Sequence, residues 1–344
     1  MTDVVAATPG LYPLPDRAKE ELSDLKGHQK HDLVDGEEGA AVADAYDEVR
    51  GEFVADQRDA GLDRIVEGQG RWDDMLAHPL TVHDNVETGG IVRYYDNNNF
   101  YRDPRVVGEL AASGDVAAEL SATADLLGED DALQAVLPGP YTLADLASDE
   151  HYGDEAEFLD AVGDFLAGEV DGFPAHETLF LLEPSYVTNA PGDDANELAS
   201  ETVDRVAAAT DADVVVQTYW EAFEETAYAH LMDADVDAVG FDFVAADREA
   251  NLECVNEYGT KGDIALGLVD GQNTLVEDAE TVAERVDWVH ERIPAQTFET
   301  TYVTPNTETF YLPVNKHRAK LSVLAEAAGI AAGDADAAET EVEA

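Results

Sequence analysis

Two carboxylates stand directly after apolar runs of the kind that form buried strands. Glu183 ends the run "TLFLLE" (178–183), and Asp242 ends the run "VGFD" (239–242). Burial at such a position removes water from a carboxylate, which raises its pKa and suits it to proton transfer or to binding an amine. We therefore predict that Glu183 and Asp242 are catalytic. A helix or loop cap is the alternative for Glu183, and a buried structural hydrogen bond is the alternative for Asp242.

Polar residues also follow the other apolar runs. Ligands of proteins with parallel strands bind at the carboxyl ends of those strands, where such residues gather. We predict that they bind substrate: Gln69, Arg71, Tyr219, Asp270, Asn273 and Asn306.

Cations are scarce in this chain, which has 19 Lys plus Arg against 76 Asp plus Glu. Six of them could attract an anionic ligand if they were grouped at one mouth, because Arg offers two parallel donors to a carboxylate. They are Arg17, Lys19, Arg71, Arg93, Arg102 and Arg105. The alternative is that they pair with nearby acids.

The net charge of -57 predicts a halophilic protein, with an acidic surface for basic partners as the alternative. Molar salt screens such self-repulsion. The 45% hydrophobic content indicates a folded core. Nucleic acid is not expected as a partner, because the sequence lacks clusters of Lys and Arg. The absence of a leader or of an apolar run of about 20 residues predicts a cytoplasmic protein without a membrane partner.

Eight short apolar runs alternate with stretches of helical spacing, such as Val42, Ala45, Tyr46, Val49 and Phe53. This pattern predicts an α/β fold, a single (βα)8 TIM barrel, with a doubly wound open sheet as the alternative. The segment 78–104 is too long for an ordinary connection, so we expect an inserted excursion over the barrel mouth after the second strand. Residues 1–330 would form the barrel domain, and residues 331–344 a disordered acidic tail. The runs are 3–8, 63–68, 133–140, 178–184, 213–220, 236–243, 263–271 and 300–306.

Several motifs, in order and spacing, resemble the cobalamin-independent methionine synthase family, over roughly residues 1 to 330. The family contains two related barrels, and the amino-terminal barrel, which does not bind zinc, is the more similar one. The motifs are "GLYP" (10–13), "GQGRWDDM" (68–75), "VRYYDNNNFYRDP" (92–104), "LPGPYTL" (137–143), "LLEP" (181–184), "GLVDGQN" (267–273) and "TPNTETFYLP" (304–313).

The resemblance implies a methylated pterin as co-substrate. The run "RYYDNNNFY" is similar to the segment that helps to bind the polyglutamylated pterin, so Arg93 and Asp96 are expected to bind substrate. Arg17 and Lys19 are similar to basic residues of the first loop that meet the glutamate tail.

The resemblance also implies that this chain does not hold zinc. The family's catalytic barrel binds zinc through a His-x-Cys pair, a Glu and a second Cys, and the matching positions here are Tyr219, Glu221, Asp242 and Thr307. Cys254 is the sole cysteine, so neither a cysteine-based zinc cluster nor an intramolecular disulfide can form.

The function implied by the resemblance is methyl transfer from a methylated folate-type pterin to homocysteine in methionine biosynthesis. A separate zinc-bearing methionine synthase chain would be the partner, and the substrates would be small molecules. Two alternatives stay open: a noncatalytic pterin-binding or regulatory subunit, and a barrel of the uroporphyrinogen decarboxylase type acting on another substrate.

Overall fold

The computed structural model describes residues 2–26, 40–94, 100–192 and 195–333. Apart from its first three residues, the tail predicted at 331–344 lies outside these ranges. Residues 331 and 332 belong to the last helix, α13 (Val314–Ala332).

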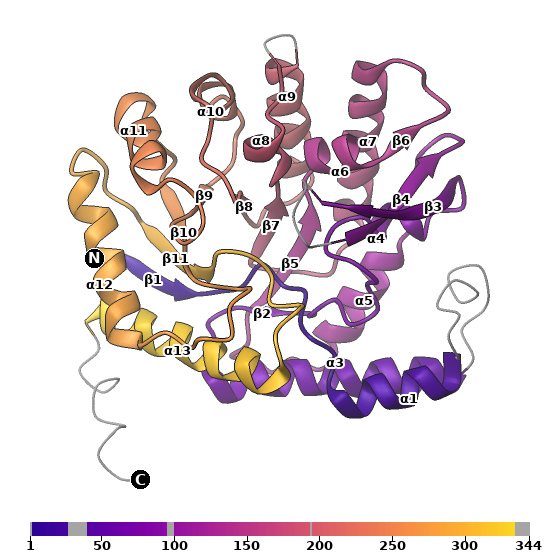
Figure 1. Cartoon of the computed structure of the whole chain (residues 1–344), viewed down its shortest axis with the longest axis horizontal. Coiled ribbons are helices and arrows are strands. Elements are labelled where there is room, and N and C mark those ends of the chain that lie inside the picture. Colours follow the sequence, from indigo (N-terminus) through magenta and orange to yellow (C-terminus); the bar gives the residue numbers. More distant parts are fainter. Residues whose placement is uncertain (1, 27–39, 95–99, 193–194, 334–344) are drawn as a thin grey trace.

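A curled parallel sheet forms the centre of the molecule (Figure 1). Every one of the eight predicted runs contributes a strand, so the prediction of the strands is confirmed. The strand order is β1-β11-β10-β9-β8-β7-β5-β2. From β2 onward, each strand of this sheet lies beside the one that follows it along the chain, and β1 lies beside the last strand, β11. The order does not reverse, so the doubly wound alternative is wrong. The strands are β1 (Asp3–Ala6), β2 (Ile65–Val66), β5 (Leu133–Pro138), β7 (Thr178–Leu182), β8 (Asp213–Gln217), β9 (Ala238–Asp242), β10 (Asp263–Val269) and β11 (Thr300–Pro305).

The sheet has the shape of a half-barrel whose two edge strands are β1 and β2. The loop before β2 reaches the β1 edge through Asp63. Its carboxylate accepts a hydrogen bond from Ala6 N at 2.7 Å, and its own N–H donates to Ala6 O at 3.2 Å.

Helices follow the strands and cover the outer face of the sheet. The helical spacing around Tyr46 is confirmed, because Val42, Ala45, Tyr46, Val49 and Phe53 are all buried on α3. The helices are α1 (Asp16–Lys26), α3 (Ala40–Ala60), α5 (Asp115–Ala124), α6 (Pro140–Leu146), α7 (Glu155–Asp171), α8 (Ser185–Thr188), α9 (Asn196–Ala207), α10 (Glu225–Leu231), α11 (Arg248–Tyr258), α12 (Ala279–Arg292) and α13.

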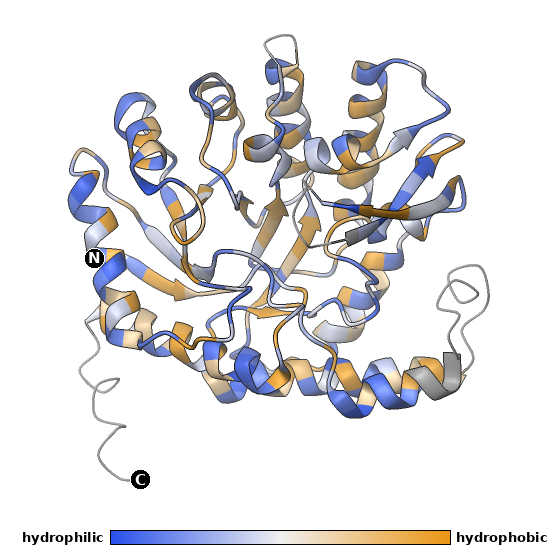
Figure 2. Cartoon of the chain, viewed as in Figure 1, coloured by the Kyte–Doolittle hydropathy of each residue, from blue (hydrophilic) through white to orange (hydrophobic). Residues whose placement is uncertain are grey.

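Strands β5, β7, β9 and β10 are buried along their whole length, which explains why their sequences are mostly apolar. Apolar residues accordingly concentrate in the central strands, while polar and apolar residues alternate along the surrounding helices (Figure 2). In the described part of the chain, no helix combines the length and the apolar composition that a membrane span requires.

The excursion after the second strand is an antiparallel hairpin. It begins with the short helix α4 (His78–Thr81) and continues as β3 (Val86–Arg93) and β4 (Phe100–Val106). Together with β6 (Ser148–Asp149), these strands form a second sheet of three strands. The hairpin pairs Val92 with Tyr101 and Arg93 with Phe100, and it thereby brings Arg93 and Tyr101 beside each other.

Candidate functional site

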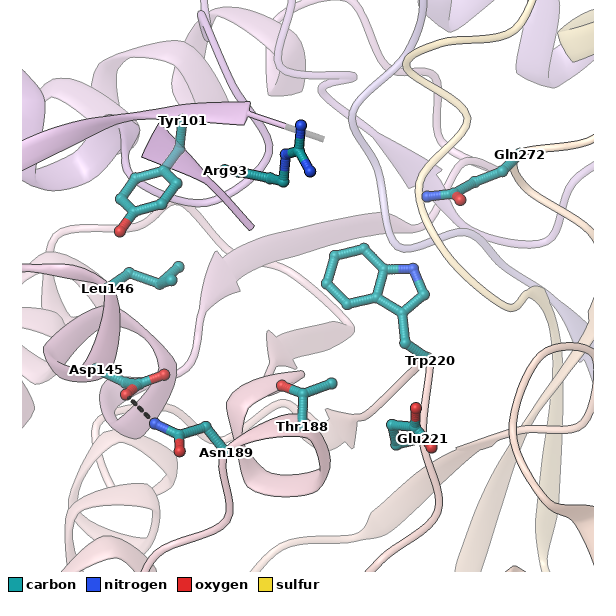
Figure 3. Close-up of a pocket in the computed structure, with 9 residues that line it drawn as sticks. All are labelled: Arg93, Tyr101, Asp145, Leu146, Thr188, Asn189, Trp220, Glu221 and Gln272. Carbon is teal, nitrogen blue, oxygen red and sulfur yellow. Dashed lines mark hydrogen bonds between the residues drawn. The ribbon is translucent and has the colours of Figure 1, made fainter. Parts of the chain in front are cut away.

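A cavity of about 570 Å³ lies between the hairpin and the segments that follow strands β5, β7, β8 and β10 (Figure 3). This is the carboxyl-terminal side of the sheet, where ligands of parallel α/β proteins bind. The volume is in the range of pockets for small molecules and cofactors. The lining residues are Arg93, Tyr101, Asp145, Leu146, Thr188, Asn189, Trp220, Glu221 and Gln272.

The hairpin supplies a cation and an aromatic ring to one wall of the cavity, Arg93 and Tyr101. Tyr101 stacks on Tyr94, with ring centroids 4.7 Å apart. Buried Asp74 holds Tyr94 and the strand that carries Tyr101 in place, because it accepts hydrogen bonds from Tyr94 OH at 3.1 Å and from Arg102 N at 3.3 Å. Burial raises the pKa of Asp74.

Trp220 supplies a second aromatic wall, on the loop after β8. Its backbone has φ +82°, a left-handed conformation that is uncommon for a residue with a side chain. The edge of the Tyr219 ring packs against it at a centroid distance of 4.8 Å. The N–H of Trp220 donates to Asp242 Oδ2 at 3.0 Å, which helps to hold this conformation.

Asp242 and Asn306, both predicted site residues, meet in one hydrogen-bond network. Asn306 Nδ2 donates to Asp242 Oδ2 at 2.9 Å, and Gly271 N donates to Asn306 Oδ1 at 2.9 Å. The other oxygen of Asp242 accepts from Val244 N and Ala245 N at 2.7 and 2.8 Å. Asp242 therefore holds together the loops after β8, β9 and β11. This geometry favours its structural alternative over direct catalysis.

Glu183 is completely buried at the start of α6. Its Oε1 accepts from Tyr141 N at 3.0 Å, and its Oε2 accepts from Thr142 N at 2.7 Å. Burial raises its pKa to about 7, and the hydrogen bonds with Thr142 and Tyr141 act in the opposite direction. Glu183 thus caps α6, which was its alternative, and it does not line the cavity.

The loop after β10 forms a turn around Asp270. Its Oδ1 accepts from Gln272 N at 2.9 Å and from Asn273 N at 3.0 Å. Asn273 in turn accepts from Leu275 N at 3.0 Å. Asp270 and Asn273 therefore shape the loop, and the neighbouring Gln272 lines the cavity.

Gln69 is buried away from the cavity wall. It has φ +50°, and its Oε1 accepts from Leu11 N at 2.6 Å. This hydrogen bond joins the loops after β1 and β2.

The predicted cations do not meet at the cavity. Arg17 pairs with three carboxylates of α1 and α3, and Lys19 pairs with Asp16 at 3.4 Å. Arg71 pairs with Asp115 at 3.2 Å and with Glu119 at 3.0 Å. These three residues pair with nearby acids, as in the alternative, and they do not line the cavity, so their binding of substrate stays a prediction. Arg102 and Arg105 likewise pair with acids. Of the six, Arg93 alone lines the cavity. Asp96 lies outside the described residues.

A buried acid that was not predicted from the sequence lies beside Tyr219. Glu308, in the loop after β11, accepts a hydrogen bond from the hydroxyl of Tyr219 at 2.6 Å. Within the described ranges, its Oε2 has no hydrogen-bond partner. Burial raises the pKa of Glu308 from an ordinary value of 4.5 to about 7.

This shift predicts that Glu308 makes stability depend on pH. Because its pKa is higher in the folded state than in the unfolded state, the folded protein holds more protons between about pH 4.5 and about pH 7. The resulting stabilisation is complete below that window and is lost as the pH rises through it. The free energy of unfolding of the wild type should therefore fall between about pH 5 and about pH 8. In Glu308→Gln we expect this fall to be smaller by roughly 2 kcal/mol, because glutamine does not titrate.

The measurement is urea unfolding in molar KCl at both pH values. Glu284→Gln, which changes an exposed acid of α12, is the matched control and should leave the decrease unchanged. An equal decrease for wild type and Glu308→Gln would show that Glu308 is ionised throughout.

The residues at the zinc-ligand positions do not form a zinc site. Tyr219 and Asp242 are engaged in the hydrogen bonds above. The sole thiol, Cys254, is buried, and burial raises its pKa to about 11, which disfavours the thiolate that binds zinc. Across the described ranges, no group of three or more His, Cys, Asp or Glu side chains could hold a metal ion.

The sheet and its cavity define a class: α/β proteins with a curled parallel sheet that binds ligands at the carboxyl ends of its strands. Within this class, the chain belongs to the family of the cobalamin-independent synthase, N-terminal domain, whose model matches residues 82–294. The resemblance found in the sequence is thereby confirmed.

Individual relatives are distant but cover most of the chain. A methionine synthase of Saccharolobus islandicus is 23% identical over 279 residues, 80% of each chain. One of Saccharolobus solfataricus is 22% identical over 291 residues, 83% of each chain.

Solved structures share the fold. A B12-independent methionine synthase from Shewanella sp. W3-18-1, in complex with selenomethionine, has a TM-score of 0.76 at 18% identity and covers 96% of this chain and 97% of its own. A putative vitamin-B12 independent methionine synthase from Listeria monocytogenes has a TM-score of 0.72 at 16% identity, and the match covers 96% of this chain and 98% of the Listeria chain.

Proposed function

We propose that this chain takes part in methyl transfer from a methylated folate-type pterin to homocysteine in methionine biosynthesis. The observation that carries the proposal is the family match over residues 82–294, in a fold whose cavity opens at the carboxyl ends of the strands. The methionine synthases of Saccharolobus, which align over 80% or more of their length, support the same reaction.

The chemistry of the cavity suits a pterin. Tyr101 and Trp220 offer aromatic faces to a flat ring. Arg93 offers a guanidinium to the carboxylates of a glutamate tail. Of the predicted substrate-binding residues, we propose Arg93 for direct contact, whereas Asp242, Asn306, Asp270 and Tyr219 would position the loops that line the cavity.

The chemistry of the methyl acceptor requires a second chain in this proposal. Zinc lowers the pKa of a bound thiol and so generates a thiolate at neutral pH. The donor set here does not fit zinc, so a separate zinc-bearing chain would activate homocysteine. We also infer that residues 1–330 form one domain whose strands close into a complete (βα)8 barrel, a closure that the Ala6–Asp63 hydrogen bonds support.

One observation favours a second candidate, a noncatalytic pterin-binding subunit. Both oxygens of Glu183 and both oxygens of Asp242 accept hydrogen bonds from other groups of the fold. Neither carboxylate lines the cavity, so neither is placed to exchange a proton with a ligand there.

Purification of the tagged chain from its native host, in molar KCl, tests the proposal. We expect a second chain to co-purify in equal amount and to carry about one zinc ion. The pair should transfer a methyl group from 5-methyltetrahydropteroyltriglutamate to homocysteine, and each chain alone should be inactive. Recovery of this chain alone, with one zinc ion bound after dialysis, would contradict the proposal. If the zinc-bearing chain turns over fully without this chain and only binds the pterin more weakly, the result would favour a noncatalytic pterin-binding subunit.

A further inference from the structure

We propose that Asp145 is the residue that recognises the ligand of this cavity. Its partner would be the edge of a planar heteroaromatic ring on which a ring N–H and an exocyclic amine lie side by side. The inference rests on the proposed function in one respect, because the pterin of that function carries such an edge.

Asp145 lies near the end of α6 and lines the cavity from the side opposite the hairpin (Figure 3). Its Oδ2 accepts from Ser185 Oγ at 2.7 Å, and its Oδ1 accepts from Asn189 Nδ2 at 2.6 Å. These two hydrogen bonds fix the orientation of the carboxylate. Each oxygen keeps acceptor capacity, since an ionised carboxylate has about four lone-pair sites.

The partners of Asp145 are neutral, which distinguishes it from the acids of this chain that form ion pairs. Asp115, Asp131 and Asp160 are each paired with an arginine. Asp145 forms no ion pair with any described residue. It is half-buried, and burial raises its pKa. A desolvated charge without a cationic partner gains more from a charged or doubly donating ligand than a hydrated one does.

The second acid of the cavity, Glu221, is a weaker candidate. Its side chain is exposed, so water competes for its hydrogen bonds and screens its charge. Asp145 is also better fixed, because Glu183 holds the start of α6 and Tyr141 OH donates to Asn189 O at 2.7 Å. A preorganised acceptor loses little entropy when a ligand binds.

The remaining walls fit a ligand in this orientation. Tyr101 and Trp220 lie on opposite sides of the space between Asp145 and Arg93 in the view of Figure 3, and their rings would contact the flat ring system. Arg93 lies on the hairpin side, where an anionic tail would reach it. The cavity therefore offers an acceptor for N–H groups at one end and a cation at the other.

Isothermal titration with 5-methyltetrahydropteroyltriglutamate in molar KCl tests this inference. We expect Asp145→Asn to weaken binding by roughly 10- to 100-fold, the usual effect of losing hydrogen bonds to a charged group. Asp59→Asn removes the same charge from an exposed position on α3 and should bind as wild type does.

A modified ligand provides the second arm and needs only the wild-type protein. An analogue with a methyl group in place of the 2-amino group should bind wild type more weakly by a similar factor. Asp145→Asn should bind the two ligands with similar affinity, because the hydrogen bonds between the carboxylate and the 2-amino edge are already lost in this variant.

The outcomes separate the two proposals. If wild type binds the triglutamate pterin and its 2-methyl analogue equally well, Asp145 does not bind the edge that carries the 2-amino group, and the inference is wrong. If wild type binds pterin-6-carboxylate through Asp145 but no methylated pterin, the inference holds and the proposed function fails. Binding of neither compound overturns both.

Discussion

Replacement of Asp242 by alanine is expected to lower the free energy of unfolding by about 4 kcal/mol. The side chain accepts four hydrogen bonds in the buried network, from Trp220, Asn306, Val244 and Ala245. Alanine would leave all four donors without their acceptor, and each buried donor left unsatisfied costs roughly 1–3 kcal/mol. Water that reaches the loops would satisfy some of these donors, so the expected total is below the sum of four full penalties.

Urea unfolding in molar KCl measures this loss. Asp242→Asn should be milder, because the amide keeps one oxygen as an acceptor, and Asp59→Ala on the surface of α3 should change stability little. The fluorescence of Trp220 should also change in Asp242→Ala, since its backbone conformation loses a hydrogen bond. A destabilisation below about 1 kcal/mol would mean that the network contributes little to the fold.

Replacement of Gly139 by alanine is expected to cost about 3 kcal/mol and to weaken ligand binding. A Cβ atom at this position would lie 2.2 Å from Cδ and from Cγ of Glu183, closer than atoms can approach. The φ of Gly139 is -74°, so the backbone itself tolerates alanine. The damage is therefore steric: the carboxylate must leave the start of α6, and the N–H groups of Tyr141 and Thr142 lose their acceptor.

Gly262→Ala is the matched control, because a Cβ atom there would meet no atom within 4 Å. Thermal unfolding of both variants gives the difference in stability, and titration with the triglutamate pterin shows whether a shift of α6 moves Asp145. Wild-type stability of Gly139→Ala would show that Glu183 can relocate without loss, and its role as a cap would then be minor.

The main sheet could be predicted because its sequence signal is local. Strands such as β7 and β9 are buried on both faces, so most of their residues are apolar. The hairpin gave a weaker signal. β3 is largely exposed, and its pairing depends on β4 and β6, so no continuous apolar run marks it.

The site was predicted less completely, because its chemistry depends on distances across the chain. Arg71 meets Glu119, 48 residues away, and no pattern near Arg71 indicates that pairing. Glu308 was missed for the same reason, since its partner Tyr219 is 89 residues distant. Position after a strand identified Asp242 and Asn306 as candidate site residues, whereas their contact with each other and their roles followed from the structure.

The hairpin makes part of the binding wall exchangeable. Arg93 and Tyr101 are carried by an insertion with its own small sheet, while the other lining residues are carried by loops and helices of the main fold. A change in the length or sequence of this insertion would alter the side chains that face the cavity and leave the parallel strands as they are. In protein engineering, grafting a different hairpin between β2 and β5 is thus a direct route to a new ligand preference on an unchanged framework.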